Sequence, residues 1–109
     1  MPHRKWDLRI KDILASIDRI LEYTRNLDFE GFRSDTKTVD AVVRNFEIIG
    51  EAAKRIPREF ADSHPGIPWK IMAGMRDRLI HGYDQIDIPL IWRTIVNDIP
   101  SLSRKLKEL

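Results

Sequence analysis

The sequence contains no cysteine, which excludes disulfide bonds, thiolate-bound zinc and a cysteine nucleophile. No apolar run approaches the ~18 residues that a membrane-spanning helix needs. Residues 1–7 are polar and lack the apolar stretch of a signal peptide, so we expect a cytoplasmic protein. Only five glycines are present, and they form no phosphate-binding loop. We therefore do not expect the chain itself to hydrolyse or transfer nucleotides.

The composition is that of a small folded domain. Hydrophobic residues make up 42% of the 109 positions and charged residues 33%, which is too apolar for a disordered chain. A chain of this length can bury a core without cross-links, so we expect residues 1–109 to form one domain. Nineteen basic residues against 17 acidic ones give a net charge of +2. This balance permits contact with RNA but does not indicate it.

Apolar residues recur every three or four positions along most of the chain, and no segment alternates like a β-strand. This period predicts four amphipathic helices, over about residues 6–27, 35–56, 68–83 and 88–109. Pro68 suits the first turn of the third helix, and Pro100 should kink the last. The connector over residues 58–67 has room for one turn around Phe60. The predicted fold is all-α, an up-and-down four-helix bundle with a kinked last helix.

The ends of these helices carry capping residues. Residues 28–34 should separate the first two helices, Ser34 or Asp35 can cap the second, and Asp87 can cap the last. The second helix has a further, narrow apolar stripe beside its main one, formed by Ala41, Ile48 and Ala52. Its apolar face is wider than one core requires, which makes this stripe a candidate contact surface for another chain.

The segment over residues 74–83 departs from the bundle pattern, because two arginines, an aspartate, a histidine and a tyrosine fall within eight residues. One interpretation is a solvated helix end, where cations complement the helix dipole and Gly82 is a C-cap. The other is a catalytic site. Histidine exchanges protons near neutral pH, and arginine presents a planar fork of donors that matches phosphate.

Helical geometry limits the catalytic interpretation. On an ideal helix Asp77 and His81 are i, i+4 neighbours, so Asp77 could orient the imidazole. Arg76 and His81 lie five residues apart, about 140° around the helix, and diverge. They can act on one substrate only if the helix ends near His81 or if a neighbouring surface, such as a second copy of the segment, completes the site.

The spacing of Arg76, His81 and Tyr83 resembles the Arg-x4-His-x-Tyr signature of HepT-like toxins in the HEPN superfamily. Asp77 matches the Asn or Asp that usually follows the arginine in that superfamily. Residues 43–53 and 67–83 are similar to the second and third helices of the family, so the resemblance covers nearly the whole chain. A motif this short is weak by itself, whereas motif, position and flanking residues together are specific.

The resemblance implies a metal-independent endoribonuclease, without a cofactor, that acts as the toxin of a type VII toxin–antitoxin pair. It implies a homodimer in which two motifs meet in a cleft. It also implies a minimal nucleotidyltransferase antitoxin that silences the toxin by transferring AMP to Tyr83. His81 would transfer protons and Arg76 would stabilise charge on the phosphate. Asp77 would hold His81, and Tyr83 would position the scissile phosphate of the RNA substrate.

Other polar residues are weaker candidates. His3 and His64 form no recognisable metal set, and Arg78 is interpreted as an exposed cation rather than as a second phosphate contact. Glu47 and Glu51 resemble paired carboxylates, but a solvated or interface face explains them better. Two other classes of function stay open: a module that binds RNA or a nucleotide without cleaving it, and a structural partner subunit of a nucleotidyltransferase.

Overall fold

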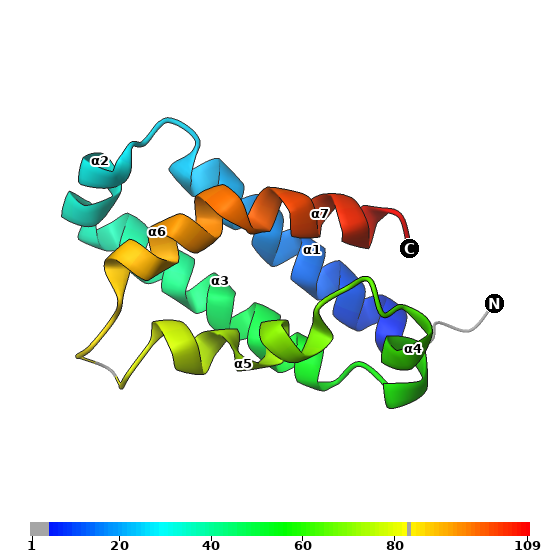
Figure 1. The fold of residues 1–109 in the computed structure, drawn as a ribbon. Helices are drawn as coiled ribbons and strands as arrows, with labels where there is room; N and C mark the ends of the chain where they lie inside the picture. Colours follow the sequence, from blue (N-terminus) through cyan, green and yellow to red (C-terminus); the bar gives the residue numbers. More distant parts are fainter. Residues whose placement is uncertain (1–4, 83) are drawn as a thin grey trace.

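The computed structural model describes residues 5–82 and 84–109 (Figure 1). Within this part of the chain there are seven α-helices and no β-strand. They are α1 (Lys5–Thr24), α2 (Phe29–Ser34), α3 (Thr36–Lys54), α4 (Arg58–Ser63), α5 (Trp69–Leu79), α6 (Ile88–Asn97) and α7 (Ile99–Lys107). The prediction of an all-α fold is confirmed.

Four long segments form the bundle and enclose one core. Helix α1 packs against α3 and α7, α3 packs against α5, and α5 packs against α6 (Figure 1). The side chains that recur at helical spacing in the sequence are the buried ones, including Ile13, Ile17, Ile20, Val42, Phe46, Ile49, Met72, Leu79, Ile91, Ile99 and Leu106. Each large apolar side chain buried in this way contributes about 1.5–3 kcal/mol.

The caps of the long helices follow the sequence signals. Asp35 caps α3 by accepting a hydrogen bond from the Thr38 N–H at 3.1 Å, and the Thr38 hydroxyl donates to its second oxygen at 2.7 Å. These bonds, with that of the hydroxyl first, lower the pKa of Asp35 below its ordinary value. Asp87 caps α6 by accepting from the Leu90 N–H at 3.0 Å. Of the two caps considered for α3, Asp35 is therefore the one used.

Two connectors are more ordered than the sequence pattern suggests. Residues 28–34 do separate α1 from α3, but they contain α2, which Asp28 caps and which buries Phe32 in the core. The predicted turn around Phe60 is α4. The Phe60 ring stacks on that of Trp6 with centroids 4.2 Å apart, which holds α4 beside the start of α1.

The last predicted helix is divided rather than merely bent. Helix α6 ends at Asn97 and α7 begins at Ile99, with Asp98 between them. Pro100 lies in the first turn of α7, where its missing N–H leaves no hydrogen bond unmade. The predicted kink is therefore confirmed, and the proline starts the second half of the segment.

Candidate active site

Helix α5 ends at Leu79, four residues before the predicted end near residue 83. Ile80 has extended backbone angles, with φ −129° and ψ 115°, and pairs with Ile86 in an antiparallel bridge. The His81 N–H donates to the Gln85 carbonyl at 2.7 Å, and the Asp87 N–H donates to the Leu79 carbonyl at 2.9 Å. These bonds across a chain reversal replace the next helical turn, so the predicted helix length was wrong.

The early end of α5 changes the geometry of the motif. His81 lies beyond the helix, in a short reversal where Gly82 has a φ of +94°, a value that favours glycine. The i, i+4 relation expected between Asp77 and His81 is therefore absent, because it requires both residues to be helical. One of the two conditions stated for convergence of Arg76 and His81, a helix that ends near His81, is met.

Arg76 is held between two carboxylates on the surface. Its Nε lies 3.9 Å from Glu47 Oε2, and its Nη1 lies 3.4 Å from Asp77 Oδ1. The Arg76 side chain remains 45% exposed, so a ligand in solvent can reach the guanidinium. The expectation that Asp77 holds His81 was therefore wrong, because Asp77 contacts Arg76 instead.

Gly50 marks the point where α3 lies against α5 beside Arg76. A Cβ at Gly50 would be 3.6 Å from the carbonyl oxygens of Met72 and Ala73 and 3.7 Å from the Arg76 Cβ. Helices α3 and α5 therefore approach closely at this point, and Glu47 lies one turn before Gly50 on the same helix. The interpretation of Glu47 as a solvated or interface residue missed its contact with Arg76. The nearby glycine is the signal in the sequence that could have indicated it.

The remaining candidate residues are either exposed or lie outside the part of the chain that the structure describes. His81 is exposed, and its ring has no hydrogen bond to any residue that the structure describes. Arg78 is exposed on the side of α5 that faces α6 and α7. Tyr83 lies outside the described residues, as does His3. In one copy of the chain the candidate site therefore consists of Arg76 with its two carboxylates and of His81, five residues further along the chain.

Two further observations concern metal ions and membranes. In residues 5–82 and 84–109 no group of three His, Asp or Glu side chains is placed to hold a metal ion. The His64 ring instead lies against Phe60 and within hydrogen-bond distance of the Ser63 hydroxyl. None of the described helices is long and apolar enough to cross a membrane.

Comparison with known proteins decides the family. The family model described as "Ribonuclease HepT-like" matches residues 13–109. The chain belongs to the HepT-like ribonuclease family. It is 50% identical over 100 residues to the "Probable ribonuclease HepT" of Thermococcus cleftensis, an alignment that covers 92% of this chain and 91% of that protein.

A second relative is a provisionally named RNase of Caldanaerobacter subterraneus, 42% identical over 92% of this chain and 89% of that protein. No solved structure matches the chain at a significant level. Membership of the HepT-like family confirms the resemblance drawn from Arg76, His81 and Tyr83, and it confirms the predicted class of enzyme, a ribonuclease. The HEPN-like helical fold agrees with it.

Proposed function

We propose that this HepT-like protein is a metal-independent endoribonuclease whose reaction centres on Arg76 and His81. The observation that carries the proposal is the end of α5 at Leu79, which leaves an exposed histidine just beyond the helix that presents Arg76. RNA supplies its own nucleophile, the 2′-hydroxyl, so the protein must move protons and stabilise charge on phosphate. Both chemistries are available here, from imidazole and from guanidinium.

The reaction balances with these groups. His81 accepts the proton of the 2′-hydroxyl as the 2′-oxygen attacks phosphorus, and the bond from phosphorus to the 5′-oxygen breaks. A second imidazole donates a proton to the departing 5′-oxygen, which leaves a 2′,3′-cyclic phosphate and a 5′-hydroxyl. Arg76 faces the negative charge that builds on the phosphate oxygens. Asp77, which contacts Arg76, positions the guanidinium and so serves the substrate indirectly.

The second imidazole is the reason to propose a homodimer, with residues 1–109 of each copy acting as one domain. Two copies of the segment around Arg76 and His81 would face each other across the axis and supply a base and an acid. The narrow stripe on α3 offers only part of the expected contact surface. Ala52 is 6% exposed and lies in the core, whereas Ala41 and Ile48 are half-buried. Sedimentation at micromolar concentration tests the proposal, and a monomer there contradicts it.

We further propose that the protein acts in the cytoplasm as the toxin of a type VII toxin–antitoxin pair, controlled through Tyr83. A minimal nucleotidyltransferase antitoxin would transfer AMP to the phenol oxygen with release of pyrophosphate from ATP. The added phosphodiester carries one negative charge and would repel RNA phosphate from the same segment. Co-expression followed by intact-mass spectrometry and peptide mapping tests this step. An adduct on Tyr23, or no adduct, contradicts it and leaves the ribonuclease proposal standing.

The experiment that tests the central proposal is RNA cleavage by the wild type and by His81→Ala. Loss of a general acid–base lowers the rate by about 10²–10⁴-fold. His64→Ala is the matched control, because it removes another imidazole at a distance from α5's C-terminal end, and circular dichroism verifies both folds. Cleavage that survives His81→Ala places the active site elsewhere. RNA binding without any cleavage by the wild type favours the non-catalytic binding module.

A further inference from the structure

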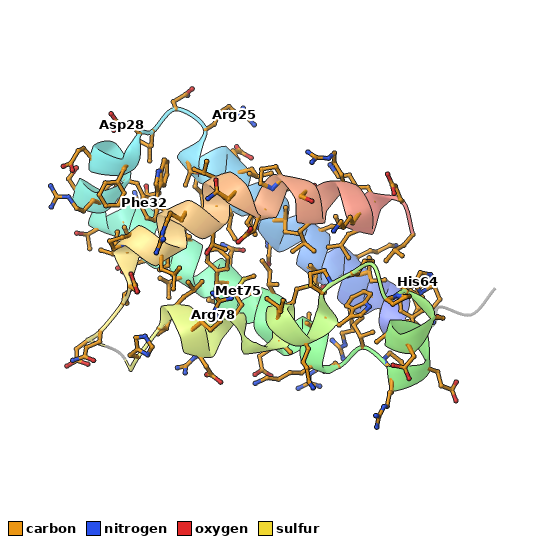
Figure 2. The ribbon with its side chains drawn as sticks, viewed as in Figure 1. Arg25, Asp28, Phe32, His64, Met75 and Arg78 are labelled. Atoms are coloured by element: carbon orange, nitrogen blue, oxygen red, sulfur yellow. The ribbon has the colours of Figure 1, made fainter. Side chains whose placement is uncertain are left out.

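A groove runs along the side of α5 opposite to Glu47, between α5 and the α6–α7 segment. It has a volume of about 310 Å³, within the usual size of small-ligand sites. Its lining combines the side chains of Pro68, Ile71, Met72, Met75, Arg78, Leu79, Thr94, Asn97, Asp98, Ser101, Leu102 and Lys105. Figure 2 shows Met75 and Arg78 on the side of α5 that faces α6.

The floor of the groove is apolar and its far edge is polar. Met72, Met75 and Leu79 are each buried, and Ile71 beside them leaves 56% of its surface exposed. Asn97, Asp98 and Ser101 lie where α6 ends and α7 begins, and among the described residues their side chains make no hydrogen bond. An apolar floor suits the face of a nucleobase, and amide, carboxylate and hydroxyl groups suit its edge.

The groove has more cations than carboxylates. Neither Arg78 nor Lys105 forms an ion pair with another described residue, whereas Arg76 on the opposite side contacts two carboxylates. Asp98 is the single carboxylate of the lining, so the groove carries a net positive charge. Two free cations above an apolar floor are complementary to a nucleotide, which joins a flat base to a charged phosphate.

The groove ends close in the chain to the segment that carries His81. Arg78 and His81 are three residues apart, so even a fully extended chain separates their Cα atoms by no more than about 11 Å. Leu79 both lines the groove and accepts the Asp87 N–H bond that closes the reversal carrying His81. A strand with one phosphate at His81 therefore has its neighbouring nucleotide within reach of the groove.

We propose that the groove between α5 and α6–α7 binds the RNA nucleotide adjacent to the scissile phosphate. The base lies on Met72, Met75 and Leu79, and Arg78 contacts the phosphate with Lys105 beside it. This inference rests on the proposed ribonuclease function, since it places the nucleotide relative to His81. It gives Arg78 a role that its exposed position alone does not indicate.

Binding of a short single-stranded RNA, labelled with fluorescein and followed by anisotropy, tests the proposal. The parent protein is His81→Ala, which leaves the labelled strand intact under the proposed mechanism. Arg78→Gln should raise the Kd about tenfold and reduce the dependence on salt by about one phosphate contact. Arg104→Gln is the matched control, because Arg104 is an exposed cation on α7 that does not line the groove, and its Kd should change less than about twofold.

A second variant tests the groove itself rather than its charge. Ser101→Trp fills the space from the half-buried rim, and it should weaken binding of normal RNA more than binding of the same strand with one base removed. Circular dichroism and sedimentation are measured on each variant. An unchanged Kd in either variant overturns the proposal. So does conversion of a dimer to a monomer by Ser101→Trp, because the groove is then an interface between copies.

The outcomes separate this inference from the proposed function. If the wild type cleaves RNA and Arg78→Gln binds RNA with an unchanged Kd, only the groove proposal is overturned. Binding that depends on Arg78, in a protein that cleaves no RNA, removes the ribonuclease proposal and keeps the nucleotide site. A parent protein that does not bind the labelled strand overturns the groove proposal.

Discussion

Arg76 and Arg78, two residues apart on α5, lie in opposite electrostatic surroundings. Arg76 points toward α3 and has Glu47 and Asp77 within 3.9 and 3.4 Å of its guanidinium nitrogens. Arg78 points toward α6 and α7, where it lines an apolar groove and has no carboxylate partner among the described residues. A sequence motif that counts charges treats these two arginines alike, whereas the fold gives them different neighbours.

The different neighbours of Arg76 and Arg78 suit the two arginines to different roles. Ion pairs between exposed side chains contribute only about 0–1 kcal/mol to stability, so the two carboxylates around Arg76 matter more for where the guanidinium points. Their charges also oppose the approach of phosphate, which must displace or share the arginine. Arg78 has no such restraint and adds positive potential to its groove. One face of α5 thus holds Arg76 in place, and the other leaves Arg78 without a carboxylate partner among the described residues, as the proposed binding of RNA in the groove requires.

The largest effect on RNA cleavage is expected from variants of Arg76, on the side of α5 that faces α3. Arg76→Ala should lower RNA cleavage by about 10²–10³-fold, because the donor facing the developing phosphate charge is lost. Arg76→Lys should restore only a small part of the rate, since an ammonium lacks the planar fork. Initial cleavage rates measure both. The melting temperature should stay near that of the wild type, because the side chain is 45% exposed, and wild-type rates for Arg76→Ala would contradict its role.

A variant of Glu47 tests whether this carboxylate holds the Arg76 guanidinium in place. Glu47→Gln should lower kcat about tenfold with little change in KM, because the variant leaves Arg76 present but less well placed. Glu51→Gln is the matched control, since Glu51 lies one turn further along α3 and pairs with Lys54 at 3.6 Å instead. The double variant with Arg76→Ala should be no slower than Arg76→Ala alone. Additive effects would show that Glu47 acts independently of Arg76.

The close contact of α3 and α5 at Gly50 can be varied in size. Gly50→Ala should keep activity and fold, because the added Cβ meets its neighbours at ordinary contact distances of 3.6–3.7 Å. Alanine also favours a helix over glycine by about 1 kcal/mol. Gly50→Leu should push α5 from α3 and lower both the melting temperature and cleavage. Equal behaviour of the two variants would mean that this contact does not place Arg76.

The smallest effect concerns a residue away from both faces of α5. The pKa of Asp35 is lowered by its bonds from Thr38, so its cap stabilises the fold above its unfolded pKa of about 4 and weakens as the pH falls through the folded value. Asp35→Asn should flatten the fall in melting temperature between neutral and acidic pH. Asp40→Asn, on the same helix, is the control. An identical acid response in the two variants would exclude this contribution.

Much of the fold was predictable from local patterns. The apolar period located the long helices, Asp35 and Asp87 capped where expected, and Pro100 marked the division of the last segment. The end of α5 was not predictable in the same way. It depends on backbone bonds from His81 and Asp87 that form only when the chain reverses, and Gly82 was the local signal that a reversal could lie there.

The contacts of the candidate site were less predictable than its residues' place in the sequence. Arg76 and His81 were proposed from their spacing, and the family that this spacing pointed to is confirmed, whereas the roles of the two residues stay a prediction. Arg76 and Glu47 are 29 positions apart in the sequence, and their contact depends on the register between α3 and α5. Helical period within one segment carries no information about register between two segments. Asp77 was assigned to His81 for the same reason, since an ideal helix was assumed past Leu79.

Asp87 joins the site to the bundle in a way that bears on how the protein opens. Its N–H bonds to the last carbonyl of α5, and its carboxylate caps the first turn of α6 by accepting from Leu90. Fraying of that turn would therefore release the reversal that carries His81. The amides of His81, Asp87 and Leu90 should exchange with solvent deuterium together, as one cooperative unit of opening. The reversal around His81 then stays formed only as long as the first turn of α6 stays formed.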